Sequence, residues 1–506
     1  MKIKSMLPLL LSAVLFESVV QVQVQAQAQA PMSLYPDPAP PINQKEKPFE
    51  YRPLDKTFWF EVEEGIKDPN NLYVIRLADQ RMKKLGKESL VGTEAEAALG
   101  QGLARHGLTF AATSLFSEIV KTKQGTQAAW LALIELQEIA KKNPVDDDGV
   151  YGELVFDIDY DTPPKEVLDF VAYQNGMFNR LKGYTEWSEQ DLKKVSVGSY
   201  WEYKLRYLSA LDDVKKDHID SAIEKFSSLG NNELTPKDIR TDSNHQFARL
   251  VFEKGDYQQA YKVFKQVELN PRERGLILLE RAWAKYYLKD YGKALGLLTA
   301  LEAPVFDPSR SPEAYILKML IYKELCYYDA AFEVLNEFKG KFSKSVDAIK
   351  KRRDLKKDQM LINMSVIDRR IGYWVNYLNL LKEERTNFKA FSSLSVYAGI
   401  RREYDLKISE VKNRLDLMLK DKIRESANDL LDWQEQISFL DYQTRVDSLR
   451  VTRPAGEVEV KAETIPLTKF DKVYWLFKGE YWIDELESLK VFVESQCNKN
   501  DGGAKK

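Results

Sequence analysis

Apolar residues recur three and four positions apart along most of the chain, starting at about Phe58. This spacing places them on one face of an α-helix. Three stretches differ. Residues 30–48 are rich in proline, residues 146–164 are acidic, and Val458, Val460 and Ala462 alternate with charged residues as in a short strand. We therefore expect an all-α protein with one small hairpin near its C-terminal end.

An internal repeat lies within "FARLVFEKGDYQQAYKVFKQVELNP", residues 247–271. The motif Asp256-Tyr257-x-x-Ala260 returns 34 residues later, from Asp290 to Ala294, and Ala248 returns as Ala282. Such a repeat is a pair of antiparallel helices whose apolar faces are buried only by stacking. Alanines let the helices approach closely, and Gly255 permits the tight turn between them. We interpret these residues as structural rather than catalytic.

The period of 34 residues, the Asp-Tyr-x-x-Ala motif and Pro271 after the second helix resemble the tetratricopeptide superfamily. The resemblance implies a solenoid of helical hairpins that binds partners on its surface. More degenerate repeats follow the same spacing on both sides. They contain Tyr328 and Ala331; Ala210, Ala222, Phe226 and Leu229; and Gly100, Gly107, Ala112 and Phe116.

After Phe342 the pattern changes to a long, charged helical signal with few glycines. Its apolar positions step by four and three, with a slip after Met418, as in a coiled coil with a stutter. The stripe consists of Tyr404, Ile408, Val411, Leu415 and Met418, then Ile423, Ala427, Leu430, Trp433, Ile437 and Leu440. Residues 345–384 can supply an antiparallel partner. The basic run "KKRRDLKK" at 350–357 is interpreted as a solvated face, with an anionic glycan, lipid or acidic protein as the alternative.

The C-terminal part is crowded with aromatic residues, including Trp475, Tyr481 and Trp482. We interpret it as a cap over the last apolar face of the solenoid, with a docking site for a partner or glycan as the alternative. The stretch from Gly479 to Leu486 resembles the ending of envelope repeat proteins of gliding and predatory bacteria.

The first 28 residues read as a secretory signal peptide. Lys2 and Lys4 precede a short apolar run, and Ala26-Gln27-Ala28 forms a cleavage site. We expect the mature chain to begin near Gln29 in the periplasm. Without a cysteine beside this site we expect no lipid anchor, and we expect no transmembrane helix because later apolar runs are too short.

Composition narrows the possible chemistry. The net charge is −2, which gives no global field for nucleic acid. Three histidines and two cysteines cannot supply a zinc motif. Asp157, Asp159 and Asp161 resemble the start of a calcium loop, but Thr162 stands where glycine is needed. We expect no metal or cofactor. Cys326 is expected as a buried thiol in a repeat helix, with a disulfide to Cys497 as the alternative.

We therefore expect a periplasmic scaffold that binds other proteins of a bacterial envelope assembly, such as motility or transport machinery. Partner contacts are assigned to Asn244, Arg249 and Lys285 on the first helices of the repeats, and to Trp475, Tyr481 and Trp482. A glycan- or peptidoglycan-associated binding protein is the alternative. A lytic-transglycosylase-like enzyme is disfavoured, because no second catalytic motif follows any of the Glu-Ser pairs.

The predicted segments are listed here in chain order. They are a signal peptide (1–28), a proline-rich linker (29–52), N-terminal helical repeats (53–145), an acidic insert with connecting helices (146–200), a tetratricopeptide repeat core (201–343), a long helical hairpin (344–450), a hairpin with an aromatic cap (451–497) and a disordered tail (498–506).

Overall fold

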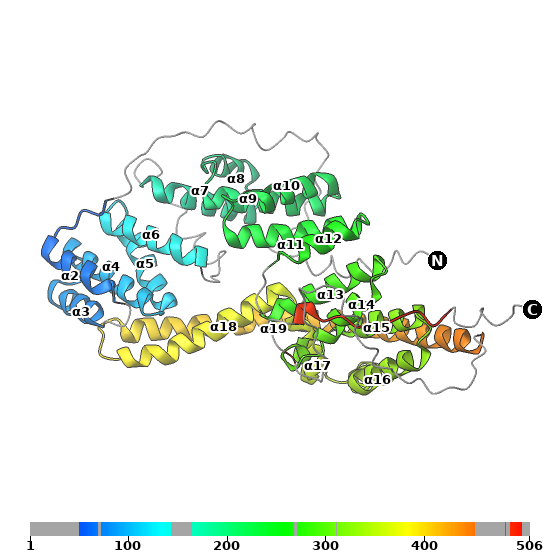
Figure 1. Cartoon of the computed structure of the whole chain (residues 1–506). Coiled ribbons are helices and arrows are strands. Elements are labelled where there is room, and N and C mark those ends of the chain that lie inside the picture. Colours follow the sequence, from blue (N-terminus) through cyan, green and yellow to red (C-terminus); the bar gives the residue numbers. More distant parts are fainter. Residues whose placement is uncertain are drawn as a thin grey trace, which may run out of the picture. The chain divides into compact units, whose positions relative to one another are not determined.

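The computed structural model describes residues 50–68, 72–142, 164–267, 271–309, 311–450, 481 and 486–497. In these ranges the chain forms α- and 3₁₀-helices and no strand. The predicted all-α solenoid of helical hairpins is confirmed (Figure 1). The signal peptide, the aspartates of the acidic insert, the predicted strand at 458–462, Trp475, Trp482 and the tail lie outside the described residues.

The chain divides into two compact units, and the first contains the N-terminal helices. It comprises residues 1–218, 232–239 and 369–418. Its helices are α2 (Lys56–Ile66), α3 (Tyr73–Leu85), α4 (Leu90–Arg105), α5 (Thr109–Thr122), α6 (Gln127–Lys142), α7 (Lys165–Leu181), α8 (Thr185–Leu192), α9 (Tyr200–Lys215), α18 (Arg369–Asn387), η4 (Phe388–Phe391) and the first part of α19 (Tyr397–Arg450).

The hairpin of α4 and α5 shows why its small residues recur at the repeat spacing. Ala112 and Phe116 are fully buried, and a Cβ on Gly100 would lie 2.6 Å from the Phe116 ring. Gly107 has a φ of 80° at the turn between the two helices. The glycine on one helix therefore makes room for the aromatic ring of the other, as the sequence pattern predicts.

A buried carboxylate ties α18 and α19 to this hairpin. Glu384 of α18 is 2% exposed and accepts hydrogen bonds from the backbone N–H groups of Thr109 and Phe110, at 3.0 and 2.9 Å. The hydroxyl of Tyr404 on α19 also donates to it, at 2.8 Å. Free N–H groups at a helix start carry a partial positive charge, so Glu384 caps α5 from a distant part of the chain. Burial raises the pKa of Glu384, and these hydrogen bonds oppose the rise.

The second unit comprises residues 219–231, 240–368 and 419–506. Its helices are α10 (Ile219–Asn231), most of α11 (Lys237–Glu253), α12 (Tyr257–Phe264), α13 (Pro271–Tyr287), α14 (Tyr291–Ala300), η2 (Pro304–Ser309), α15 (Pro312–Glu324), α16 (Tyr328–Lys350), η3 (Leu355–Lys357), α17 (Gln359–Val366), the second part of α19 and η5 (Leu486–Ser488).

The Asp-Tyr-x-x-Ala motif begins the second helix of each hairpin. The carboxylates of Asp256 and Asp290 accept hydrogen bonds from backbone N–H groups three residues later and cap α12 and α14. The four repeat alanines, Ala248, Ala260, Ala282 and Ala294, have no exposed surface. The burial of these four alanines agrees with the interpretation that the motif serves helix packing.

Consecutive hairpins turn in the same way. Gly255 has a φ of 90°, a left-handed conformation that glycine adopts without strain. The equivalent residues of the next two hairpins, Lys289 and Cys326, adopt φ values of 59° and 60° despite their side chains. In each turn the next residue donates a backbone hydrogen bond across the turn to the carbonyl five residues before it. The turn geometry therefore holds even where the sequence lacks glycine.

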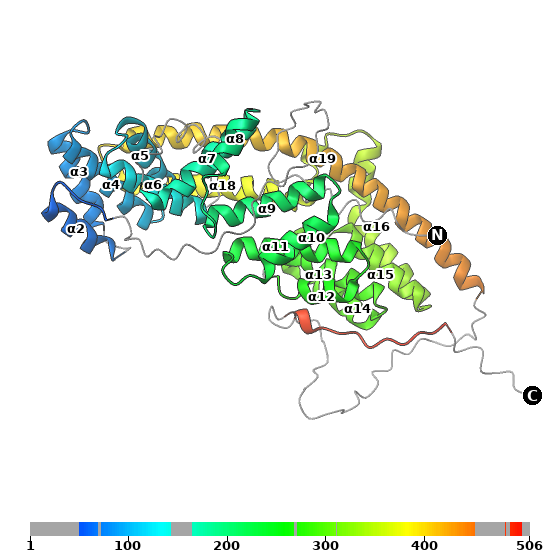
Figure 2. The ribbon, with the colours of Figure 1, turned by 90° about the horizontal axis from the view of Figure 1, so that it is seen from above.

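Helix α19 runs without a break for 54 residues (Figures 1 and 2). Ten residues of its predicted apolar stripe are buried, and Met418 is half-buried. In the first unit α18 lies antiparallel to it, because Arg385 pairs with Asp405 at 2.6 Å and the Arg414 guanidinium lies 4.1 Å from the Trp374 ring centroid. In the second unit Lys422 pairs with Asp368 at 3.4 Å. Residues 344–450 thus contribute to both units.

A volume increase at a helix crossing tests this packing. Ala260→Trp overfills a site with no exposed surface, so we expect unfolding free energy to fall on the order of 1–3 kcal/mol or more. Chemical denaturation measures the loss. Gln258→Trp is the control, because the Gln258 side chain is exposed. Its neighbour Gln259 is half-buried and is therefore less suitable. We expect Gln258→Trp to change the unfolding free energy by no more than about 0.5 kcal/mol. Equal losses would contradict the assigned crossing.

Candidate functional site

Two of the residues predicted to contact partners, Asn244 and Lys285, make contacts inside the second unit. The Asn244 side chain donates to the Gly230 carbonyl at 3.5 Å. The Lys285 ammonium lies 2.9 Å from the Asp290 carboxylate and 4.3 Å from the centroid of the Tyr261 ring. Tyr481 is half-buried. The described residues do not bring these positions together in one site, and their role in partner binding stays a prediction.

Arg249, the third of the helix residues, belongs to a buried charge cluster that the sequence analysis did not identify. Its Nε atom lies 2.7 Å from Oε1 of Glu280, and His245 Nε2 lies 2.7 Å from Oε2 of the same carboxylate. All three side chains are at most 8% exposed. Burial opposes ionisation of Glu280, but Arg249 and His245 outweigh it and lower the pKa of Glu280. The sequence does contain a sign of this cluster, because His245 and Arg249 lie on either side of Ala248 in a stretch whose apolar pattern predicts burial.

A second buried carboxylate lies on the next hairpin. Glu313 of α15 accepts a hydrogen bond of 2.6 Å from the indole N–H of Trp283 on α13. Burial raises the pKa of Glu313 to about 7, and the nearby Glu280 carboxylate adds to the rise. The interior of the hairpin stack therefore contains one paired carboxylate and one that titrates near neutral pH.

The C-terminal segment, residues 486–497, begins with η5 and continues from residue 489 as an extended chain on the outside of this hairpin stack (Figures 1 and 2). Its side chains alternate: Leu489, Val491 and Val493 are half-buried, and the residues between them are exposed. The backbone N–H of Val491 donates to the Gly292 carbonyl of α14 at 2.9 Å. The Lys293 ammonium donates to the Leu489 carbonyl at 3.0 Å. The segment is held mainly through its backbone.

Two glycines of α14 form the seat for this segment. A Cβ on Gly296 would lie 2.1 Å from the Leu489 carbonyl oxygen, and one on Gly292 would lie 2.4 Å from that of Val491. Gly292 and Gly296 are four residues apart and so face the same side of the helix. Any other residue at either position would force the segment away. We call this face of α14 the glycine seat.

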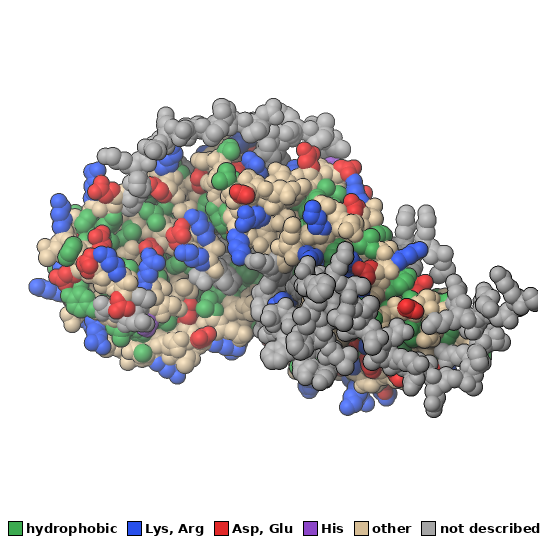
Figure 3. All heavy atoms as spheres, in the orientation of Figure 1, with side chains coloured by type: hydrophobic (Ala, Val, Ile, Leu, Met, Phe, Trp, Pro, Cys, Tyr) green, Lys and Arg blue, Asp and Glu red, His purple; other side chains and the backbone are tan. Residues whose placement is uncertain are grey.

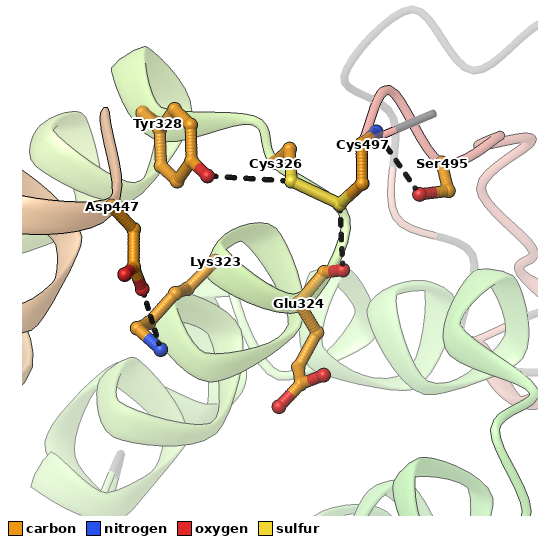
Figure 4. The surroundings of a disulfide bond; sticks show 7 residues. All are labelled: Lys323, Glu324, Cys326, Tyr328, Asp447, Ser495 and Cys497. Carbon is orange, nitrogen blue, oxygen red and sulfur yellow. Dashed lines mark hydrogen bonds and ion pairs between the residues drawn. A yellow bond between two sulfur atoms is a disulfide. The ribbon is translucent and has the colours of Figure 1, made fainter. Parts of the chain in front are cut away.

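The far end of the segment is anchored by a disulfide between Cys326 and Cys497 (Figure 4). The Cα atoms are 5.2 Å apart, and the backbone N–H of Gln496 donates to the carbonyl of Leu325, the first residue of the turn after α15, at 3.0 Å. The Tyr328 hydroxyl donates to the Cys326 sulfur at 3.3 Å. The expectation of a buried thiol at Cys326 is wrong, because Cys326 lies in the turn after α15 rather than inside a helix, where its side chain can reach the segment.

Positive charge surrounds the seat. Burial lowers the pKa of Lys293 to about 8, and the cations Arg281, Lys285 and Lys265 lower it further against the opposing effect of Asp290. Elsewhere, on the visible face of the described residues, charged side chains of both signs are interspersed (Figure 3). A main-chain or carboxylate oxygen is therefore the favoured neighbour of Lys293, and the Leu489 carbonyl supplies one.

This arrangement can recognise an extended peptide. It offers a carbonyl acceptor, a cationic donor and a face without side chains, so that two backbones can approach closely. Among the described residues, no group of histidine, cysteine, aspartate and glutamate could hold a metal ion. None of the described helices is both long and apolar enough to cross a membrane.

No protein-family profile, curated protein or solved structure matches this chain.

Thiol titration tests the disulfide. We expect the denatured, unreduced protein to expose no free thiol and the reduced protein to expose two. Because the bond joins residues 171 positions apart, we expect reduction to lower the unfolding free energy by about 2–4 kcal/mol. Denaturant unfolding with and without reductant measures the difference. Two thiols before reduction would contradict the bond.

The pH dependence of stability tests the environment of Glu313. Its folded pKa of about 7 lies above its ordinary value of 4.5, so the folded chain retains a proton that the unfolded chain loses between these values. Stability therefore falls as pH rises through this window and levels off above it. Glu313→Gln cannot lose this proton and keeps an acceptor for Trp283. We expect the variant to be more stable than the parent at pH 8, on the order of 1–3 kcal/mol, and similar to it at pH 5.

Glu333→Gln on α16 serves as the matched control, because the Glu333 side chain is exposed. We expect its stability curve to follow that of the parent at every pH. Parallel curves for Glu313→Gln and the parent would show that Glu313 is not held protonated by burial.

Proposed function

We propose that this protein is a periplasmic scaffold of the tetratricopeptide type that binds partner proteins of a bacterial envelope assembly. The observation that carries the proposal is the extended part of the C-terminal segment, residues 489–497, on the glycine seat, held by backbone hydrogen bonds to α14 and to the turn after α15. The chain thus contains an example of peptide recognition on a surface of stacked hairpins. Solenoids of helical hairpins commonly act through such surfaces.

The sequence supports the same proposal. The 34-residue period, the capped second helices and the alanines at the crossings are features of tetratricopeptide hairpins. The signal-peptide pattern of residues 1–28 supports export. An exported protein with a disulfide fits an oxidising compartment such as the periplasm.

A glycan-binding function is the second candidate, favoured by one observation. Tyr184 and Trp187 at the start of α8 are 51% and 53% exposed, and their ring centroids are 5.2 Å apart. Exposed aromatic rings have an apolar face and a polar edge and are frequent at binding surfaces. This pair could receive a sugar ring of the cell wall, so it defines a direct control for the scaffold proposal.

Cross-linking in intact cells tests the proposal. We expect the tagged full-length protein to fractionate with the periplasm and to cross-link to a reproducible set of envelope proteins. We expect no co-sedimentation with purified peptidoglycan. Sedimentation that is lost in Trp187→Ala would favour the glycan candidate instead. A cytoplasmic protein that retains Met1 would contradict the envelope assignment.

A further inference from the structure

The C-terminal segment covers the face of α14 that carries Gly292 and Gly296, where another backbone can approach closely. We propose that the glycine seat is a binding site for an extended segment of a partner protein, and that residues 489–497 occupy it as an internal ligand held by the Cys326–Cys497 bond. This inference rests on the proposed function and names the surface through which it would operate.

The internal ligand defines the chemistry of the partner. The half-buried side chains of the internal ligand are aliphatic and stand at alternate positions, Leu489, Val491 and Val493. The partner needs a backbone N–H opposite the Gly292 carbonyl and a carbonyl or carboxylate oxygen opposite Lys293, where the chain's own atoms lie at 2.9 and 3.0 Å. Because these contacts use main-chain atoms, the seat selects an extended conformation and aliphatic spacing more than one sequence.

The covalent bond is what keeps the internal ligand in place. Apart from the disulfide, the contacts of the segment include a few hydrogen bonds, half-buried aliphatic side chains and the buried side chain of Leu486. The polypeptide already tethers the segment, and the disulfide adds a second, much shorter tether beside the seat. A short tether raises the effective concentration of such a ligand to the millimolar range, so a separate peptide competes poorly while the bond is closed. Opening the bond allows the segment to leave and a partner to enter.

The bond lies where a thiol reagent can reach it. Both cysteines are half-buried rather than enclosed, and Cys326 lies in a turn. A dithiol reductant opens the bond by exchange. One thiolate of the reductant attacks a sulfur of the Cys326–Cys497 bond, which forms a mixed disulfide and releases the other cysteine as a thiolate. The second thiolate of the reductant then attacks the mixed disulfide and releases the remaining cysteine. The dithiol is oxidised to a disulfide, and Cys326 and Cys497 are each reduced to a thiol.

A purely structural tie is the competing explanation. In that case the segment would stabilise the stack, and the seat would have no affinity for a separate peptide. The two explanations differ in whether a peptide binds in trans once the segment is lifted, and in whether that binding depends on the glycines.

The test uses the full chain with Cys326→Ser, Cys497→Ser and Val491→Pro, here called the open variant. The serines remove the bond, and proline removes the N–H that contacts the Gly292 carbonyl. The probe is a fluorescent synthetic peptide of residues 486–497 with Cys497→Ser, and its native Val491 retains that N–H. Fluorescence anisotropy measures binding.

We expect the open variant to bind the peptide at least about 100-fold more tightly than the oxidised parent, because the internal segment has lost its short tether and one of its hydrogen bonds and so competes weakly. Adding Gly296→Ala to the open variant should lower the affinity at least about 10-fold, because its Cβ would meet the Leu489 carbonyl at 2.1 Å. Adding Gly340→Ala is the matched control. It is also a helical glycine, but its Cβ would meet nothing within 4 Å, so affinity should not change.

Folding of each variant is checked by circular dichroism and a cooperative melt. Should the open variant fail to fold, the Val491→Pro variant with its native cysteines is reduced and its two thiols are alkylated before the same titration. The inference is overturned by an absence of peptide binding to the opened protein, by equal binding to the oxidised parent, or by unchanged affinity in Gly296→Ala. Peptide binding with no envelope protein cross-linked would contradict the proposed function and leave the seat intact.

Discussion

Close approach of helices at alanine positions is the constraint on which the hairpin stack of the second unit depends. Ala248, Ala260, Ala282 and Ala294 have no exposed surface, so no larger side chain fits between the helices without moving them. A single hairpin cannot bury its apolar face, and each is stabilised by the next. Packing of this kind makes the angle of every hairpin depend on its neighbours, and it positions the seat on α14 relative to the turn after α15.

Charges inside the stack add a second constraint. Glu280 pairs with both Arg249 and His245, and Glu313 accepts a hydrogen bond from the indole N–H of Trp283. A buried ion pair contributes little net stability, but removing one partner typically costs about 3–5 kcal/mol because the other charge is left uncompensated. In the first unit Glu384 serves in a similar way, since it caps α5 while lying on α18. Each of these carboxylates links helices from different parts of the chain.

The C-terminal segment links structure to function. It joins α14 to the turn after α15, and its contacts with α14 are main-chain contacts over two glycines. Those glycines weaken α14, because glycine is about 1 kcal/mol less favourable than alanine inside a helix. The seat thus combines a local cost in helix stability with a close backbone approach. That combination is more readily explained by recognition of a chain than by packing of the helix alone.

The amino-acid sequence by itself determined the local part of this structure. The period of the apolar residues indicated helices, and the alanines marked the crossings in the second unit. The stripe from Tyr404 to Leu440 is buried, as its spacing predicts, except at the half-buried Met418. Such patterns depend on neighbours within a few helical turns, so they can be read without coordinates. Capping by Asp256 and Asp290 follows from the same local rules.

Tertiary structure decided which distant residues meet. The two parts of α19 belong to different units, Arg249 and His245 meet Glu280, and Cys326 meets Cys497. Each pairing depends on small rotations summed over many helices, which no short window of sequence contains. Cys326 illustrates the limit: it lies in the turn after α15, whereas the sequence pattern predicts a helix at this position. Its partner is 171 residues away, and only the path of the folded chain brings the two sulfur atoms together.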